Sequence, residues 1–198
     1  MSKYYNLTIK KVVKETKDAI TIHFKMPLFK KVKYQSGQFL TLIMTIDGTS
    51  YRRAYSICTA PRLDKTVAIT VKRVENGVIS NYLNDNAKEG DKMEIMEAMG
   101  TFVLKENRSQ ERNMILIGSG SGITPLMSMI KNVLHNEKNS RVTLIYGNRN
   151  ESSIIFKAEL DKLVSQHQNR FEGLLLSFMS KKTLSQRGAH CPTKRSKR

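Results

Sequence analysis

The most informative segment of this sequence reads Gly118-Ser119-Gly120-Ser121-Gly122-Ile123-Thr124-Pro125. It follows an apolar run, Met114 to Ile117, and precedes an amphipathic stretch, Thr124 to His135. A strand, a glycine-rich turn and a helix in this order leave free backbone N–H groups at the start of the helix, where a phosphate binds readily. The Gly-x-Gly-x-Gly spacing differs from the usual dinucleotide fingerprint, and no P-loop lysine follows. A tight turn that binds no ligand is the alternative interpretation.

The alternation of strand and helix continues beyond this segment. Residues 141–146 form a second apolar run, and residues 152–164 have the spacing of a second amphipathic helix. Such alternation is typical of a parallel sheet with covering helices. We therefore expect a partial parallel α/β nucleotide-binding domain over residues 113–165, to which Leu174-Leu175-Leu176 can add one more strand. We interpret this domain as incomplete, because parallel α/β domains usually have about 100 residues or more.

The preceding part of the chain, residues 1–106, has a different pattern. Short β-rich runs are separated by turn residues, and Asp47-Gly48 is a hairpin signal. We expect strands over residues 5–13, 19–26, 38–46, 50–58, 67–74 and 93–97, and one short helix over residues 80–86. Several short strands at this spacing predict a small antiparallel β-barrel. The fold class is thus a β-barrel followed by a parallel α/β domain.

The charge of the chain is unusual. Its 198 residues carry a formal net charge of +17, and the last 29 residues hold eight Lys or Arg residues against one acidic residue. Nucleic acid, an anionic membrane surface, and an acidic protein or phosphate-bearing ligand are the partners that this charge favours. Because no nucleic-acid reader motif is recognisable and much of the excess lies at the end, we expect no nucleic acid. Residues 166–198 are interpreted as a basic, poorly ordered tail.

Composition also limits location and metal content. No apolar run approaches the length of a membrane span, and the first residues carry no secretion signal, so we expect a cytoplasmic protein without a membrane span. Only two cysteines are present, Cys58 and Cys191, which are too few to ligate an iron–sulfur cluster. The histidines are isolated in the sequence, and we expect no metal site.

Two weaker motifs lie in the barrel part. Arg53-Ala54-Tyr55-Ser56 places a cation, an aromatic ring and a hydroxyl on one strand, with residues 53 and 55 on the same face. Gly77-Val78-Ile79-Ser80 precedes the short helix, and a serine at a helix N-cap with a glycine upstream can host an anion. An ordinary exposed strand and an ordinary cap are the alternatives.

The order of these three motifs resembles the ferredoxin–NADP⁺ reductase superfamily. Its Arg-x-Tyr-Ser, Gly-x-x-Ser and Gly-x-Gly-x-Gly-x-x-Pro signatures match Arg53 to Ser56, Gly77 to Ser80 and Gly118 to Pro125. Val71-Lys72-Arg73 is similar to its flavin-lining strand, and Tyr146-Gly147-Asn148-Arg149 to the segment beside the adenosine ribose. Within the superfamily, the chain resembles most the reductase components of bacterial ring-hydroxylating or phenylacetyl-CoA-type oxygenases.

The resemblance implies FAD and NADP or NAD as cofactors, with site residues carried over by position. Tyr55 and Ser56 would act at the flavin ring, the first by stacking and the second near N5. The other residues implied to contact FAD are Arg53 at the pyrophosphate, Val71 and Lys72 along the flavin, and Gly77, Val78 and Ser80 at the helix start. Those implied to contact the nicotinamide dinucleotide are Gly118, Gly120 and Gly122, with Thr124 near the flavin edge and Arg149 at a 2′-phosphate.

The implied function is a flavin-dependent NAD(P)H oxidoreductase that passes electrons to an iron–sulfur or flavin acceptor. Such acceptors, for example a ferredoxin or flavodoxin, are commonly acidic, so Lys30, Lys31 and Lys33 would steer docking or else form an ordinary solvated surface. The alternative is a non-catalytic flavin-binding module or a truncated, inactive reductase. That alternative arises because the family has a late Cys-Gly-Pro-like loop, whereas here Cys191-Pro192 lies in the basic tail. On that interpretation the protein still binds FAD, but its rate of NAD(P)H oxidation is severely reduced.

Overall fold

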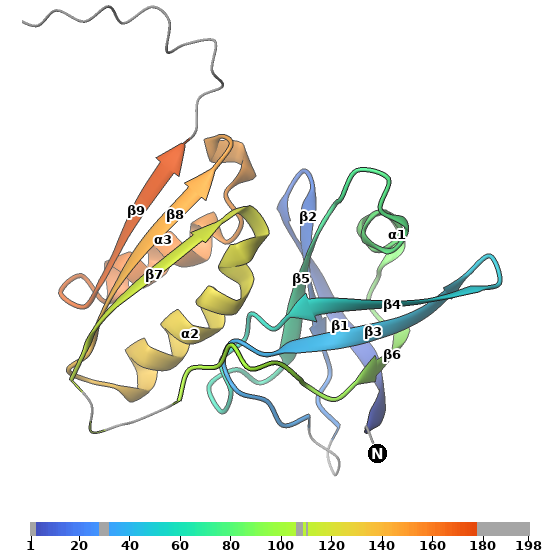
Figure 1. Ribbon diagram of the computed structural model, residues 1–198, viewed down its shortest axis with the longest axis horizontal. Helices are drawn as coiled ribbons and strands as arrows, with labels where there is room; N and C mark the ends of the chain where they lie inside the picture. The colour runs from blue at the N-terminus through green and yellow to red at the C-terminus, as the bar shows by residue number, and fades with distance from the viewer. Residues whose placement is uncertain (1–2, 28–31, 106–108, 110, 178–198) are drawn as a thin grey trace, which may run out of the picture.

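The computed structural model describes residues 3–27, 32–105, 109 and 111–177. Figure 1 shows two units side by side, an antiparallel barrel and an α/β unit whose helix α2 lies next to the barrel. The tail was expected over residues 166–198, but residues 171–177 form a strand, so its predicted start was wrong. Residues 178–198 and the lysines at positions 30 and 31 lie outside the described residues.

The barrel is a curled six-stranded antiparallel sheet with the strand order β4-β3-β6-β1-β2-β5. Its strands are β1 (Tyr4–Thr16), β2 (Ala19–Phe24), β3 (Phe39–Ile46), β4 (Thr49–Ser56), β5 (Val67–Lys72) and β6 (Lys92–Met96). The outer strands β4 and β5 meet where Ile57 forms a bridge with Ile69 and the Cys58 N–H donates to the Ala68 carbonyl at 2.9 Å. The expected antiparallel barrel is therefore confirmed.

The hairpin between β3 and β4 follows from two residues. Asp47 and Gly48 both have positive φ angles, 48° and 75°, and the strands pair from Ile46 opposite Thr49 onward. A two-residue turn of this kind matches the twist of the flanking strands. The resulting register places Arg53 opposite Leu42 and Tyr55 opposite Leu40.

Helix α1 (Val78–Asn86) begins two residues earlier than expected. Gly77 is its N-cap residue, so the interpretation of Ser80 as the N-cap was wrong. The Ser80 hydroxyl instead accepts from the Val74 N–H at 3.1 Å and donates to the Gly77 carbonyl at 3.4 Å. These bonds close the turn before the helix and explain why the helix starts at residue 78.

The second unit is a three-stranded parallel sheet in the order β7-β8-β9. Along the chain it consists of β7 (Asn113–Ser119), a 3-10 turn (Gly120–Gly122), α2 (Ile123–Asn136), β8 (Arg141–Asn148), a second 3-10 turn (Glu151–Ser153), α3 (Lys157–Gln166) and β9 (Phe171–Ser177). The third strand at Leu174 is present, so the sheet extends past the domain end expected at residue 165. The second helix starts at Lys157 because Phe156 takes a left-handed conformation.

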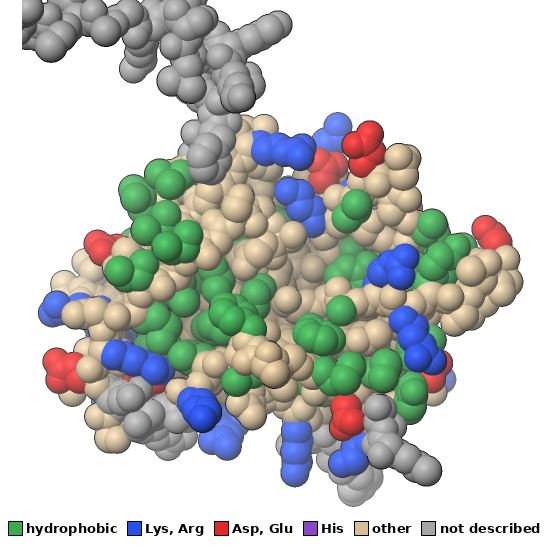
Figure 2. All heavy atoms as spheres, in the orientation of Figure 1, with side chains coloured by type: hydrophobic (Ala, Val, Ile, Leu, Met, Phe, Trp, Pro, Cys, Tyr) green, Lys and Arg blue, Asp and Glu red, His purple; other side chains and the backbone are tan. Residues whose placement is uncertain are grey.

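The two faces of this sheet differ. Both helices share one apolar cluster with Leu116, Leu144 and Tyr146, which point to the same side of the sheet. The opposite side carries Ile117, 71% exposed, and Leu174, 56% exposed, on either side of Ile145. Figure 2 shows apolar side chains gathered over β7 and β9 on this side. We call it the open apolar face, made up of Ile115, Ile117, Ile145, Leu174 and Leu176.

Candidate functional site

The glycine-rich turn lies at the carboxyl end of β7. A Cβ on Gly118 would lie 2.8 Å from Leu126 Cδ1, and Gly120 has a φ of +52°, so close packing and the turn itself account for these two glycines. The Gly120 carbonyl accepts from the Tyr146 hydroxyl at 2.8 Å. A Cβ on Gly122 would meet no atom within 4 Å. The protein itself therefore gives no packing reason for a glycine at position 122.

The start of α2 is built around Thr124. Its hydroxyl donates to the Ser121 carbonyl at 2.8 Å, and its side chain is buried. Pro125 lies in the first helical turn, where its missing N–H costs nothing. The Ile123 N–H already donates to the Gly120 and Ser121 carbonyls of the 3-10 turn. The other N–H groups of the first turn have no partner within the helix, and they carry the positive end of the helix dipole. An anion above the glycine turn would meet these groups, whereas the Thr124 hydroxyl is already used.

Lys72, the last residue of β5, is the barrel residue that lies next to the glycine-rich turn. Its Nζ lies 3.4 Å from the position that a Cβ on Gly120 would occupy. The preceding residue, Val71, is fully buried in the barrel core, so its side chain cannot contact a ligand and only its backbone can. The sequence-based role of Lys72 concerned the flavin alone, whereas its position here is next to the glycine turn.

Arg53 and Tyr55 share one face of the outer strand β4, as predicted, and Ser56 lies on the other. The Arg53 guanidinium lies 5.9 Å from the centroid of the Tyr51 ring and donates to the Arg52 carbonyl at 2.9 Å. Burial raises the pKa of Tyr55, and the nearby charge of Arg53 offsets part of this rise. The Tyr55 hydroxyl is therefore protonated at neutral pH, beside an exposed cation.

At the turn before α1, backbone N–H groups rather than side chains are available to a ligand. A Cβ on Gly77 would lie 2.6 Å from Ser80 Oγ, so the close approach of these residues requires glycine. Ser80 is buried and its hydroxyl is used inside the turn, whereas Val78 is exposed at the helix start. The first-turn N–H groups of α1 are thus the part of this motif that can meet an anion.

The carboxyl end of β8 holds Asn148, which the sequence analysis placed in the segment beside the adenosine ribose without giving it a role of its own. Both amide atoms of Asn148 are buried without a hydrogen-bond partner, while Arg149 beside it is exposed. Asn148 lines a cavity of about 230 Å³ together with Lys157, Leu175 and Leu176. The sequence motif included Asn148 but could not show that its amide is buried and unpaired.

Two further observations concern metals and membranes. The described residues contain no cluster of three or more His, Cys, Asp or Glu side chains that could hold a metal ion. Within the same ranges, no helix has the length and apolar character needed to cross a bilayer.

An antiparallel barrel followed by a parallel α/β unit with a glycine turn at its first strand defines a class of two-domain nucleotide-binding oxidoreductases. Residues 6–104 match the family model of the oxidoreductase FAD-binding domain, and residues 116–189 match that of the oxidoreductase NAD-binding domain. The chain belongs to this family of FAD- and NAD-binding oxidoreductases. The resemblance inferred from the three motifs, and the two cofactor types it implied, are confirmed.

Curated relatives extend this assignment. One component of the 1,2-phenylacetyl-CoA epoxidase of Escherichia coli is 36% identical over 186 residues, which cover 93% of this chain and 51% of that protein. The ferredoxin reductase component of the 3-ketosteroid-9-alpha-monooxygenase of Rhodococcus rhodochrous is 40% identical over 167 residues, covering 83% and 46% respectively. The chain thus spans about half the length of the curated relatives it matches.

Solved structures agree on the fold. The ferredoxin-NADP⁺ reductase of Plasmodium falciparum superposes with a TM-score of 0.76 at 22% identity, covering 91% of this chain and 72% of that one. A cytochrome P450 reductase from Amycolatopsis gives a TM-score of 0.76 at 24% identity, covering 89% and 53%. At these identities the likeness establishes the ferredoxin reductase-like fold alone.

Proposed function

We propose that this chain is the FAD- and NAD(P)-binding part of a reductase that passes electrons from NAD(P)H to an iron–sulfur or flavin acceptor protein. The observation that carries the proposal is the proximity of Lys72, at the end of a barrel strand, to Gly120 in the turn of the nucleotide unit. Because the two nucleotide-binding domains meet at these residues, a nicotinamide and a flavin bound to them would be neighbours. Electron transfer between them requires such proximity.

The side chains around this meeting point fit the two nucleotides. Gly122 leaves open space above the turn, and Lys72 adds a positive charge beside it. Two pyrophosphates need cations and free N–H groups, which Arg53 and the first turns of α1 and α2 would supply. When bound, NAD(P)H and FAD supply the hydride donor and acceptor, and the protein contributes orientation and electrostatics.

The barrel residues would hold the flavin. Arg53 would neutralise its pyrophosphate, and Tyr55 would stack on the ring system, to which its half-buried position on the same face is suited. Ser56 would donate its hydroxyl near N5. Val71 would contribute through its backbone, and Gly77, Val78 and Ser80 would form the turn that directs the α1 N–H groups at the pyrophosphate.

The α/β residues would hold the nicotinamide dinucleotide. Gly118, Gly120 and Gly122 would pass beneath its pyrophosphate, and Lys72 would face that pyrophosphate from the barrel side. Thr124 would act by closing the turn, because its hydroxyl already bonds to the Ser121 carbonyl. Arg149 would lie near the adenosine ribose, where a cation favours a 2′-phosphate and hence NADPH.

The acceptor would be an acidic electron-transfer protein such as a ferredoxin or flavodoxin. The net charge of +17 supports this choice, since complementary charge accelerates the docking of such carriers. Several relatives are, by name, reductase components of monooxygenases. A cytoplasmic location stays a prediction.

A visible absorption spectrum of the purified chain, recorded before and after anaerobic NADPH, tests the proposal. We expect a flavin spectrum after reconstitution with FAD and bleaching of that spectrum by NADPH. A flavin spectrum that NADPH leaves unchanged would favour the non-catalytic flavin-binding module. Failure to take up FAD would refute the roles given to Arg53, Tyr55 and the α1 turn.

Replacement of Gly122 tests the nucleotide site separately. A Cβ at this position meets no protein atom and the backbone φ is −62°, so Gly122→Ala should leave the thermal midpoint unchanged or slightly higher. If the dinucleotide passes over the turn, the same methyl group should weaken NADPH binding by about tenfold or more while FAD binding is retained. Gly173→Ala, which also meets no atom within 4 Å, is the matched control. Unchanged NADPH affinity in Gly122→Ala would contradict the proposed site.

A further inference from the structure

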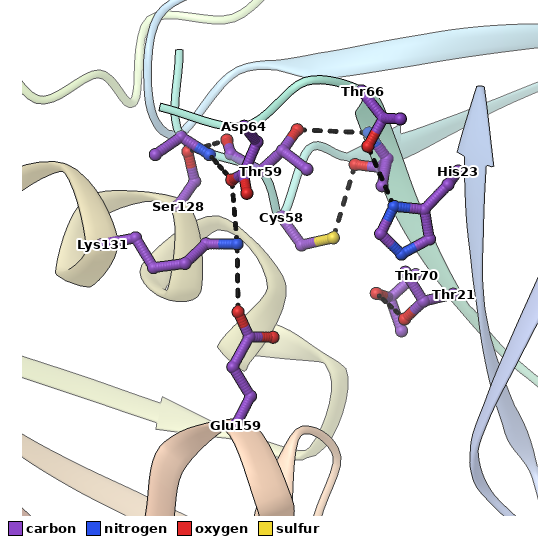
Figure 3. A network of polar contacts seen from close by, with 12 residues as sticks. Thr21, His23, Cys58, Thr59, Asp64, Thr66, Thr70, Ser128, Lys131 and Glu159 are labelled. Atoms are coloured by element: carbon purple, nitrogen blue, oxygen red, sulfur yellow. Dashed lines mark hydrogen bonds and ion pairs between the residues drawn. The ribbon is translucent and has the colours of Figure 1, made fainter. Parts of the chain in front are cut away.

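The surface where the barrel meets the α/β unit is polar at its centre. Figure 3 shows side chains from α2 and α3 facing the barrel segment that follows β4, with hydrogen bonds and ion pairs between the two units. We call this set the interdomain network; its members at the junction are Thr59, Asp64, Ser128, Lys131 and Glu159. Buried polar groups are costly unless they are paired, so a network of this kind constrains the geometry of the elements that form it.

Lys131 of α2 is the charged centre of the network. Its Nζ lies 3.0 Å from Asp64 Oδ2 on the barrel and 3.2 Å from Glu159 Oε1 on α3, and its side chain is 11% exposed. Burial alone lowers the pKa of Lys131, but the carboxylates of Glu159 and Asp64 outweigh it and the pKa is raised. The ammonium therefore stays charged between the two carboxylates.

Asp64 is itself fixed to the barrel. Its Oδ2 accepts from the Ala60 N–H at 2.7 Å, and its own N–H donates to the Ala60 carbonyl at 3.1 Å. The carboxylate that Lys131 contacts is thus an ordered part of the loop after β4, and the ion pair connects two rigid elements.

Ser128 makes the second connection, one helical turn before Lys131. Its hydroxyl donates to the Thr59 carbonyl at 2.6 Å, and its carbonyl accepts from the Ser36 hydroxyl at 3.2 Å. All three residues are at most 2% exposed. Residues three apart on a helix lie on the same face, so Ser128 and Lys131 hold one face of α2 against the barrel.

The position of α2 determines the position of the glycine turn. The helix begins at Ile123, directly after Gly122, and Ser128 lies about 7.5 Å from Ile123 along the helix axis. A helix transmits displacement along its length because its backbone is fully hydrogen-bonded. The bonds of Ser128 and Lys131 to the barrel therefore fix where the turn lies relative to Lys72 and β5.

We propose that Ser128 and Lys131 are positioning residues, which hold the nucleotide turn at the distance and angle from the flavin barrel that hydride transfer requires. The proposal rests on the function proposed above. Displacement of reacting groups by about 1 Å can lower a rate by about 100-fold, so a connection far from the reacting atoms can control the reaction.

Cys58 provides a measurement that needs no cofactor. This thiol is buried at the same junction, in one apolar cluster with residues of α2, and burial raises its pKa to about 12. In a Cys191→Ser background it is the sole cysteine, so its rate of alkylation by iodoacetamide reports opening of the junction. We expect Lys131→Met and Ser128→Ala to raise this rate by about tenfold or more, with an unchanged circular dichroism spectrum.

The matched controls are Lys162→Met and Ser165→Ala, which remove an exposed lysine and an exposed serine from α3. In both variants Cys58 should be alkylated at the same rate as in the Cys191→Ser protein. If Lys131→Met fails to fold, Asp64→Asn replaces it, because it removes the carboxylate on the barrel side, which is 30% exposed, and leaves Lys131 paired with Glu159. An alkylation rate equal to the controls in every network variant would overturn the proposal.

The second measurement uses FAD-loaded protein and a redox-inert tetrahydro analogue of NADPH as probe. A nicotinamide that stacks on a flavin gives a long-wavelength charge-transfer absorption, which depends on their relative position. We expect the variants to bind FAD as the parent does, to lose this absorption, and to show kcat lowered by about 10- to 100-fold with a smaller change in KM. Faster alkylation with unchanged absorption and unchanged kcat would overturn the positioning role.

The two measurements separate this proposal from the proposed function. If the parent protein takes up no FAD or shows no charge-transfer absorption with the analogue, the proposed function fails, and the positioning role fails with it. In that case the alkylation rates still measure whether the network closes the junction. If the parent shows both properties, the variants alone decide on Ser128 and Lys131.

Discussion

At the scale of single residues, Glu137 illustrates how a buried charge is held. It is 1% exposed at the end of α2, where its carboxylate accepts from Arg112 Nε at 3.0 Å and from the Ser140 hydroxyl at 2.8 Å. Removing one partner of a buried pair leaves the other charge without compensation. We expect Glu137→Ala to lower the free energy of unfolding by about 3 kcal/mol in urea titrations. The exposed Glu151→Ala should change it by less than about 0.5 kcal/mol, and equal effects would contradict this account.

His23 gives the stability a pH dependence. Burial, and then the charges of Lys11 and Lys131, lower its pKa from 6.5 to about 4, while Asp64 acts in the opposite direction. Between these two values the unfolded chain takes up a proton at His23 that the folded chain does not, so stability is full above 6.5 and falls toward 4. We expect the thermal midpoint to fall over this interval.

A His23→Gln variant checks the assignment, because glutamine can still bond to the Thr66 hydroxyl that lies 3.0 Å from His23 Nδ1. Its thermal midpoint should vary less between pH 6.5 and pH 4 than that of the parent. His135→Gln, which removes an exposed histidine at the end of α2, is the control and should keep the parental slope.

The site residues themselves were predictable to different degrees. Arg53, Tyr55 and the three glycines of the turn were proposed from local sequence, because strand period or spacing defines each of them, and their roles stay predictions. The burial of Val71 and Thr124 and the internal bonding of Ser80 were not found, since they depend on which face of the barrel or turn each side chain occupies. Lys72 was proposed as a flavin contact, but its proximity to Gly120 involves two domains and has no local signal.

At the scale of elements, the β3–β4 hairpin offers a direct test of turn conformation. Gly48 has a φ of +75°, and a Cβ there would meet no atom within 4 Å, so any cost of a side chain comes from the backbone alone. We expect Gly48→Ala to lower the free energy of unfolding by about 1 kcal/mol. Gly48→Asn should cost less, because asparagine tolerates the left-handed region. A loss in Gly48→Asn as large as in Gly48→Ala would refute this reason.

Most elements were predicted within a few residues, and the exceptions share a cause. The hairpin, α2 and the first two parallel strands carry strong periodicity and turn signals. The helix expected from Ser152 is divided, because residues 151–153 form a separate 3-10 turn and Phe156 takes a positive φ. Phe156 is 3% exposed, so burial of its ring in the core outweighs the local helical pattern.

At the scale of the whole molecule, the barrel and the α/β unit share one core at their junction. Ala19, Cys58 and Ala68 of the barrel belong to the same apolar cluster as Ile123 and Met127 of α2. This shared core lies beside the buried part of the interdomain network, Ser128 and Thr59, whereas Asp64 and Glu159 are partly exposed. The sequence indicated two domains of different class, but nothing in its local pattern indicated this shared core.

The open apolar face is the other molecular feature that lacked a local signal, and it leads to a prediction about association. Parallel sheets are normally covered on both faces, and an exposed apolar patch binds other apolar surfaces. We expect the double variant Ile117→Lys/Leu174→Lys to bind less of the dye ANS and to show less concentration-dependent light scattering than the parent, with an unchanged far-ultraviolet circular dichroism spectrum. Val164→Lys/Ser165→Lys adds the same two charges at exposed positions of α3, outside this face, and should leave both signals unchanged. The parental charge of +17 already opposes association, so equal reductions in both variants would mean that net charge, and not the open apolar face, controls it.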